Sequence, residues 1–314
     1  ENLPRRWFTG DVHINMKMNI PEPARKIIDR LNEHGYEAYV VGGCVRDMIL
    51  KREPGDWDIT TSARPEQVKA LFTRTLDTGI QHGTVTIMVG KEGYEVTTFR
   101  VDGDYTDGRH PDTVTFTPSL EEDLKRRDFT INAMAVCLNK ARFGELVDPF
   151  GGMADMKEKT IRTPLDPDIT FSDDPLRMMR CIRFATQLNF YIDDDTFESL
   201  CRNKDRIEII SRERIADELN KIILSPIPSK GFVELERSGL LPLIFPELAA
   251  LQGVETRNGR SHKDNFYHTL EVLDNISKKT DNLWLRWAAL LHDIAKPATK
   301  RWEPKAGWTF HNHN

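Results

Sequence analysis

The chain of 314 residues has few cysteines, no long apolar segment and no excess of positive charge. Its four cysteines are widely spaced and none belongs to a CxxC pair, so neither a structural zinc site nor a dithiol redox site is expected. The longest apolar runs, such as residues 240–245 and 287–291, are far shorter than the roughly 20 residues of a membrane-spanning helix. The formal net charge of −5 excludes an overall basic field that binds nucleic acid indiscriminately.

The composition is that of a soluble globular protein, with 39% hydrophobic and 30% charged residues. The N-terminal segment ENLPRRWFTG contains two arginines, but no apolar stretch of secretory type follows them. No signal peptide is therefore expected, and a cytoplasmic location is predicted by default.

Hydrophobic periodicity divides the chain into an α/β head and an all-helical tail. The first half contains an amphipathic helix that ends at Gly35, a strand over residues 36–41, and a hairpin of residues 84–89 and 94–100 joined by GKEG. From residue 174 to 224 the apolar residues follow helical spacing alone. Prolines then divide the chain into shorter helices, and another helical module is expected near residue 262.

The segment VVGGCVRDMILKREPGDWDIT combines a strand, a Gly-Gly turn, a helix start and two aspartates. Glycines before a helix let backbone N–H groups approach a polyanion such as a triphosphate. In an extended segment Asp56 and Asp58 point the same way, with Trp57 buried behind them. Two convergent carboxylates suit Mg²⁺, which prefers hard oxygen ligands and completes its shell with substrate phosphates.

Each feature also has an ordinary structural explanation. A lone DxD is usually a solvated turn and a lone Gly-Gly a tight bend, so the prediction depends on their occurring together in this order. Glu95, on the second hairpin strand, is a candidate third catalytic carboxylate. The alternative for Glu95 is a solvated position in an alternating strand.

Five sequence blocks resemble, in order, the class II tRNA nucleotidyltransferase and bacterial poly(A) polymerase family. They are GGCVRD with DWD, RRDFTINAMA, DPFGGMADM, DDPLRMMRCIRFA and SRERIADEL. The resemblance extends over about residues 38–225 and implies a polymerase β-type nucleotidyltransferase fold with a helical neck and body.

The resemblance assigns roles to residues of the head. The positions matching Asp56 and Asp58 bind two metal ions, which activate the RNA 3′-hydroxyl and neutralise the leaving pyrophosphate. Positions matching Arg127 and Asn132 lie near the triphosphate and ribose, whereas Asp128 is expected to orient its neighbours. The nucleotide-binding residues expected in the head are Gly42, Gly43, Arg46, Arg127, Asp128 and Asn132.

The resemblance assigns base selection to Asp174 and Arg177, with Arg180 as a third member. A spacing of three on a helix sets Asp174 and Arg177 on one face. Cytosine and adenine both present an amine beside a ring-nitrogen acceptor, which a carboxylate and a guanidinium can satisfy; uracil and guanine reverse this pattern. Arg183 is expected to be an exposed or ion-paired helical arginine.

Two further segments extend the resemblance. The Gly- and Asp-rich residues 102–116 correspond to a flexible loop that family members use when they switch from C to A addition; a surface insertion is the alternative. SHKDNFYHTL and LLHDIAKP resemble the start of an HD-type phosphohydrolase domain, with His268, His292 and Asp293 in its H…HD order. The later aspartate of that superfamily does not appear between Asp293 and Asn314, so His262, His311 or His313 would have to replace it, or the segment is an inactive remnant.

The sequence therefore predicts a template-independent nucleotidyltransferase that adds CMP and AMP to the tRNA 3′ end with CTP, ATP and Mg²⁺. The alternatives are a poly(A) polymerase, an HD phosphohydrolase with a silent head, and an inactive RNA-binding protein. We expect the nucleotidyltransferase head at residues 20–150 and the helical neck at 151–225. The helical body and linker are expected at 226–260, and a partial HD-type domain, with a candidate second divalent metal, at 261–314.

Overall fold

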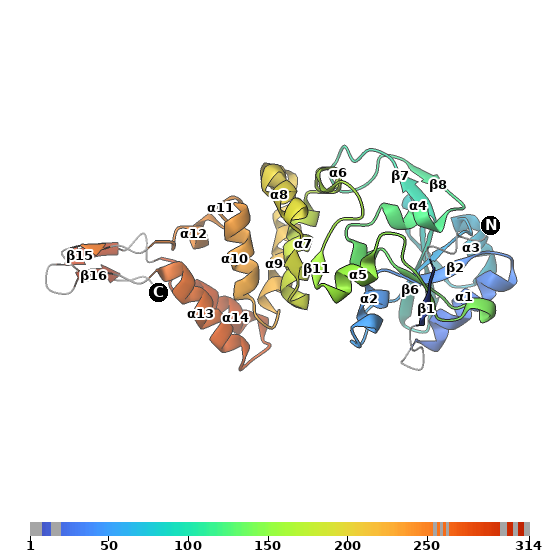
Figure 1. Ribbon diagram of the computed structural model, residues 1–314, viewed down its shortest axis with the longest axis horizontal. Helices are drawn as coiled ribbons and strands as arrows, with labels where there is room; N and C mark the ends of the chain where they lie inside the picture. The colour runs from blue at the N-terminus through green and yellow to red at the C-terminus, as the bar shows by residue number, and fades with distance from the viewer. Residues whose placement is uncertain are drawn as a thin grey trace. The chain divides into compact units, whose positions relative to one another are not determined.

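The computed structural model describes residues 8–13, 20–253, 256–257, 260–261, 264–295, 300–303 and 307–310 (Figure 1). The chain forms two compact units, Glu1–Asp166 and Pro167–Asn314. The first is an α/β unit and the second is mainly helical, which confirms the predicted order of an α/β head and a helical tail. Among the described residues, no helix has the length and apolar character of a membrane span.

The first unit is built on a mixed sheet of eight strands in the order β1-β10-β9-β2-β3-β6-β5-β4. Neighbouring strands are antiparallel except β3 and β6, which are parallel. A separate ribbon of β7 and β8 brackets the Gly- and Asp-rich segment. The strands are β1 (Phe8–His13), β2 (Ala38–Val41), β3 (Asp58–Thr61), β4 (Thr75–Gly79), β5 (Thr84–Val89), β6 (Glu92–Thr98), β7 (Arg100–Asp102), β8 (Val114–Phe116), β9 (Ala135–Cys137), β10 (Glu145–Val147) and β11 (Thr160–Ile161).

Short helices accompany this sheet. They are α1 (Glu22–Glu33), α2 (Gly43–Ile49), α3 (Pro65–Leu71), α4 (Leu120–Lys125) and α5 (Gly152–Lys157), with 3₁₀ turns η2 (Ile80–His82), η3 (Thr130–Asn132) and η4 (Lys140–Arg142). The α1 helix buries Ala24, Ile27, Ile28 and Leu31 and ends just before Gly35, whose φ of +84° suits the left-handed position after a helix.

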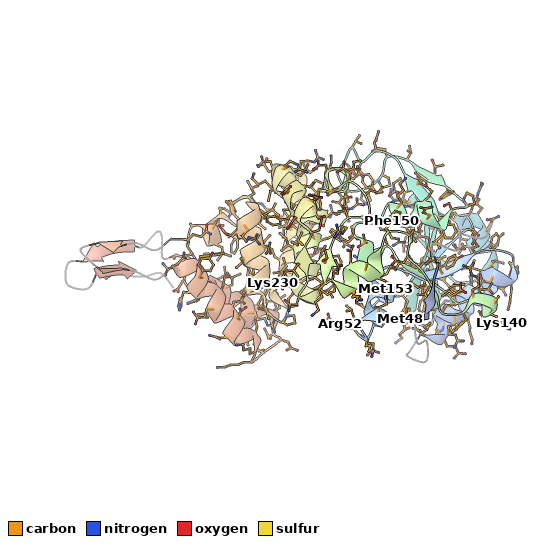
Figure 2. All side chains as sticks on the ribbon, viewed as in Figure 1. Met48, Arg52, Lys140, Phe150, Met153 and Lys230 are labelled. Carbon is orange, nitrogen blue, oxygen red and sulfur yellow. The ribbon has the colours of Figure 1, made fainter. Side chains whose placement is uncertain are left out.

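The α4 helix covers one face of the central strands. Leu120 and Leu124 pack in one buried cluster with Tyr39 and Val41 of β2. Phe150, which is labelled in Figure 2, packs against the same cluster. In β2 the residues Tyr39 and Val41 alternate with Val40, so they mark the sheet face that α4 covers. The turn after β2 and the start of β3 therefore lie at the edge of a rigid, packed layer.

The second unit contains nine helices among its described residues. They are α6 (Pro167–Asp173), α7 (Leu176–Leu188), α8 (Asp194–Asn203), α9 (Arg212–Ile223), α10 (Ser229–Ser238), α11 (Leu241–Ile244), α12 (Pro246–Ala249), α13 (Asn265–Ser277) and α14 (Leu283–Leu291). A 3₁₀ turn, η5 (Lys204–Ile209), and a two-residue strand, β12 (Tyr191–Ile192), connect some of them.

The end of the chain departs from the all-helical prediction. Two antiparallel pairs occur there: β13 (Thr256–Arg257) with β14 (Arg260–Ser261), and β15 (Lys300–Glu303) with β16 (Gly307–Phe310). Because the β15–β16 segment contains two tryptophans and a phenylalanine, which favour strands, local propensity outweighs the helical context expected there.

Candidate active site

Three carboxylates gather where β3 and β6 run side by side. Asp58 is the first residue of β3, Asp56 comes two residues earlier, and the buried Trp57 separates them. The parallel register pairs Ile59 with Val96, which sets Glu95 beside Asp58 on the same face of the sheet. The structure thus brings together all three predicted carboxylates.

The three acids repel one another. Burial raises the pKa of Asp58, and Asp56 raises it further, although Arg127 acts in the opposite direction. Burial and the charges of Asp58 and Asp56 also raise the pKa of Glu95. Carboxylates that disfavour their own ionisation at such close range form a set of hard oxygen ligands that a divalent cation would stabilise.

The Gly-Gly turn lets two arginines approach the backbone beside these acids. Gly42 has φ +83° and ψ −137°, a conformation open essentially to glycine alone. A Cβ atom on Gly42 would lie 3.5 Å from Nη1 of Arg127, and one on Gly43 would lie 3.4 Å from Nη2 of Arg46. The turn after β2 is therefore bordered by two guanidinium groups.

The RRDFTINA block connects to the turn through a chain of hydrogen bonds. Nη1 of Arg46 donates to Oδ1 of Asn132 at 2.7 Å, and Nδ2 of Asn132 donates to Oδ1 of Asp128 at 3.2 Å. The backbone N–H of Phe129 donates to the same oxygen of Asp128. These hydrogen bonds fix Asn132 between Arg46 and the largely buried carboxylate of Asp128. Arg46 itself lies beside the Gly-Gly turn.

Arg127 retains hydrogen-bonding capacity. Its Nη2 lies 3.4 Å from Oδ2 of Asp123 in α4, a residue that no sequence motif singled out. Its buried Nε makes no hydrogen bond to any described residue. A guanidinium that Asp123 holds through Nη2, with Nη1 beside the Gly42 backbone, is suited to bind an anionic ligand such as a phosphate.

The second unit holds Asp174, Arg177 and Arg180. The prediction that Asp174 and Arg177 share a helical face is wrong for Asp174, which lies in the break between α6 and α7, just before the first residues of α7. Oδ1 of Asp174 accepts the backbone N–H of Leu176 at 3.1 Å, because a short acidic side chain satisfies the free N–H groups at a helix start. A turn in which Arg177 N donates to Asp174 O still keeps the two residues adjacent.

Arg214 of α9 is the partner that the sequence prediction missed. Its Nη2 lies 3.1 Å from Oδ2 of Asp174, and both side chains are largely buried. Arg214 belongs to the SRERIADEL block, so its signal was present in the sequence, but its pairing across 40 residues was not.

The three arginines of α7, Arg177, Arg180 and Arg183, have different surroundings. Nη1 of Arg177 donates to the backbone O of Thr170, and the guanidinium of Arg180 lies 5.3 Å from the centre of the Phe184 ring. Arg183 is buried and pairs with Glu218 of α9, which confirms that it is an ion-paired helical arginine.

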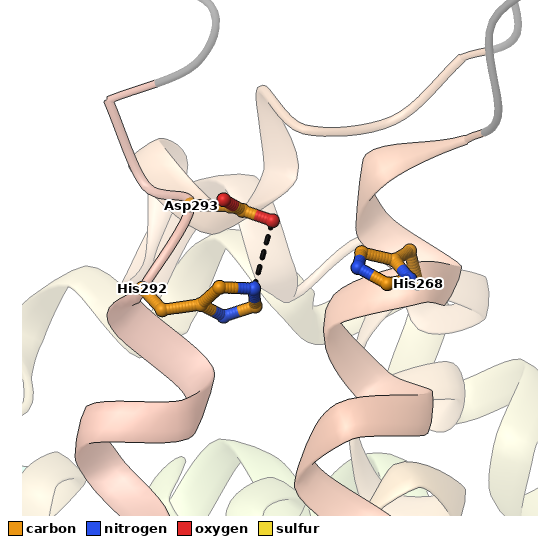
Figure 3. A group of neighbouring side chains, drawn as sticks. All are labelled: His268, His292 and Asp293. Carbon is orange, nitrogen blue, oxygen red and sulfur yellow. Dashed lines mark ion pairs between the residues drawn. The ribbon is translucent and has the colours of Figure 1, made fainter. Parts of the chain in front are cut away.

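The second unit also contains a cluster of His268, His292 and Asp293, each offering one ligand atom within 4.8 Å of the others (Figure 3). Nδ1 of His292 lies 2.6 Å from the carbonyl O of Ala289, so it must carry a proton. Nε2 of His292 faces Oδ2 of Asp293 at 2.8 Å. A divalent cation would satisfy Nε2 of His292 and the Asp293 carboxylate together, so these residues fit a metal. The proposed substitutes His262, His311 and His313 lie outside the described residues.

Comparisons with known proteins identify the families that the chain resembles. Residues 38–162 match the model of the poly A polymerase head domain, residues 189–252 match a probable RNA and SrmB-binding site of polymerase A, and residues 265–314 match the HD domain.

A CCA-adding enzyme of Geobacillus thermodenitrificans is 48% identical over 286 residues, which are 90% of this chain and 66% of that protein. One of Limosilactobacillus reuteri is 48% identical over 219 residues, 70% of this chain and 53% of that protein. The chain thus spans about half to two thirds of the length of these relatives. The crystal structure of a Bacillus stearothermophilus CCA-adding enzyme in complex with CTP matches with a TM-score of 0.68 and 35% identity, over 91% of this chain and 74% of that chain.

Proposed function

This chain belongs to the family of CCA-adding enzymes and poly(A) polymerases, and we propose that it adds CMP and AMP to the 3′ end of tRNA, using CTP and ATP and releasing pyrophosphate. The observation that carries the proposal is the set of Asp56, Asp58 and Glu95 beside the Gly42 turn and Arg127. We also propose a cytoplasmic location, because tRNA and nucleoside triphosphates are available there.

Asp56 and Asp58 would hold Mg²⁺, which supplies activation of the 3′-hydroxyl and neutralises charge on the leaving pyrophosphate. The chain's own residues orient the reactants. Arg127 binds the triphosphate where it approaches Gly42, since its fixed donors match phosphate oxygens. Arg46, Asn132 and Asp128 hold the sugar end of the nucleotide through their hydrogen-bonded chain.

We assign base selection to Asp174 and Arg177, with Arg180 beside them. Asp174 accepts one bond at each carboxylate oxygen, from Leu176 and from Arg214, and each oxygen keeps a further lone pair for the amine of cytosine or adenine. Uracil and guanine present a carbonyl there, so each lost contact would cost about 1–3 kcal/mol. Protein groups would in this way replace a nucleic-acid template.

The direct test is extension of a tRNA that ends at its discriminator base. The chain is incubated with each nucleoside triphosphate singly and with all together, and the 3′ ends are sequenced. We expect CCA with CTP and ATP, no product with UTP or GTP, and loss of all products in Asp58→Ala. Addition of A alone would favour a poly(A) polymerase. If no mixture of nucleotides gave extension, the proposed nucleotidyltransferase activity would be refuted.

The histidine cluster supports a second candidate activity, phosphate-ester hydrolysis at a divalent metal held by His268, His292 and Asp293. The contact of Nε2 of His292 with the Asp293 carboxylate is the observation that favours it. Phosphate release from 2′,3′-cyclic nucleotides should then be lost in His292→Ala and kept in Asp56→Ala. If both variants keep or lose release together, the cluster does not carry that activity.

A further inference from the structure

Asp123 is a wholly buried carboxylate to which the proposed reaction gives no role. It lies on α4, and its Oδ2 accepts the hydroxyl of Thr60 at 2.9 Å and lies 3.4 Å from Nη2 of Arg127. Its Oδ1 accepts the backbone N–H of Arg100 at 3.2 Å and lies 3.4 Å from Nε of Arg126. One carboxylate thus holds two neighbouring arginines and two separate strands.

Two of these partners lead directly to the carboxylate site. Thr60 and Asp58 are two residues apart on β3, so both project from one face of the sheet. The register pairs Thr60 with Tyr39 and Asp58 with Val41, which is the face that α4 covers. Asp123 therefore lies behind Asp58 on the same face, one step deeper in the layer.

The charges of two aspartates act on Arg127. Burial lowers the pKa of Arg127 and so does Arg126, whereas Asp123 and, more weakly, Asp58 raise it. A buried guanidinium that loses one anionic partner cannot remain uncompensated, because an unpaired buried charge is costly. Asp58, the acid proposed to hold the cation, is the other aspartate whose charge raises the pKa of Arg127, so Arg127 would turn to it if Asp123 were neutralised.

We propose that Asp123 is a positioning residue that holds Arg127 at the rear of the site and keeps it from pairing with Asp58. The carboxylate of Asp58 then stays free for a divalent cation, and Arg127 stays directed at the triphosphate. This proposal deepens the proposed function and depends on Asp58 as a cation ligand. It predicts that the charge of Asp123, rather than its hydrogen bonds alone, sets the affinity for the cation.

The test measures Mn²⁺ affinity by electron paramagnetic resonance without nucleotide, so no turnover is needed. Every variant carries His292→Ala, which removes the other candidate cation site. Asp123→Asn keeps the size of the side chain and an acceptor for Thr60 but loses the charge. We expect its Mn²⁺ affinity to fall about tenfold, which corresponds to 1.4 kcal/mol.

Two further variants distinguish a positioning role of Asp123 from a role in folding alone. In Asp123→Asn/Arg127→Gln both charges are gone, so Asp58 has no arginine to pair with and the affinity should return to within about threefold of the parent, less than 1.4 kcal/mol. A merely structural role for Asp123 predicts no such rescue. Thr60→Val removes a hydrogen bond to Asp123 without changing its charge, so the affinity should stay within about twofold of the parent.

The outcomes are distinguishable. Unchanged affinity in Asp123→Asn, or an equal loss in Thr60→Val, would overturn the positioning role. If Asp123→Asn does not fold, the double variant decides, since failure of its affinity to match the parent would also overturn the role. Unchanged Mn²⁺ binding in Asp58→Ala would instead overturn the cation site on which the proposed function depends.

Discussion

Replacing Asp58 with asparagine should make the head more stable while it stops nucleotide addition. The folded head places Asp58 where burial and Asp56 raise its pKa, so its ionised form opposes folding. A raised folded-state pKa contributes stability that is fully present below the unfolded pKa and is lost as the pH rises through the folded pKa. Above that range asparagine removes the penalty and keeps the shape.

The expected gain is roughly 0.5–2 kcal/mol at neutral pH without divalent cation, the usual range for a single stabilising substitution. For a unit of 166 residues, Glu1–Asp166, each kcal/mol raises the melting temperature by about 2–4 °C. Asp56→Asn is the comparison: Asp56 is exposed and its charge is a smaller cause of the raised pKa of Asp58 than burial, so its gain should be below that of Asp58→Asn.

Thermal unfolding followed by circular dichroism checks this prediction at several pH values, with and without Mg²⁺. The advantage of Asp58→Asn should vanish as the pH falls through the raised pKa of Asp58, because the parent carboxyl is then neutral as well. Added Mg²⁺ should stabilise the parent and not the variant, since ligand that binds the folded state alone raises stability. A variant that is less stable than the parent at neutral pH would refute the electrostatic reasoning.

Three further substitutions test other parts of the molecule. Gly42→Ala forces a side chain into a backbone region at φ +83°, so it should cost about 1–3 kcal/mol in urea unfolding and lower nucleotide affinity, whereas Gly55→Ala, with open space around it, should be nearly neutral. Glu218→Ala removes the partner of a buried arginine and should cost about 3–5 kcal/mol by the same measurement; an effect below 1 kcal/mol would contradict a buried pair. Arg214→Ala releases the Asp174 carboxylate and should reduce the ratio of kcat/KM for CTP over UTP by about tenfold, or 1.4 kcal/mol; an unchanged ratio would remove Arg214 from base selection.

The sequence predicted those parts of the fold that depend on neighbouring residues. The hairpin of β5 and β6 and the helix that ends before Gly35 follow from alternation, helical spacing and glycine conformation, and both are present, although β6 (Glu92–Thr98) begins two residues before the predicted strand of residues 94–100. The acids Asp56 and Asp58 were expected to converge because residues two apart in an extended segment share a face. Their approach to Glu95 required the parallel pairing of β3 with β6, which no local pattern specifies.

Residue spacing along the sequence did not predict contacts between distant segments. Asp174 was expected within a helix because its spacing to Arg177 is three, but a proline at position 175 follows it and α7 begins only at Leu176. The residue before a proline is disfavoured in the helical region, so a spacing rule was outweighed by backbone sterics. Its pairing with Arg214 depends on how α9 packs near the start of α7, which sequence spacing alone does not specify.

Asp58 and Asp123 have the same side chain and share an arginine, yet their surroundings shift their pKa values in opposite directions. Burial raises the pKa of Asp123, but Arg126, Arg127 and the hydrogen bonds from Thr60 and Arg100 together outweigh burial, so its net pKa lies below the usual value. Asp58 has one arginine and an acidic neighbour, so burial prevails and its pKa is raised. The acid whose pKa is lowered lies against Arg127, whereas the acid whose pKa is raised is the one that we propose as a cation ligand. A sequence motif cannot distinguish the two aspartates in this respect. The difference in pKa arises from the charges that tertiary packing brings around each carboxylate.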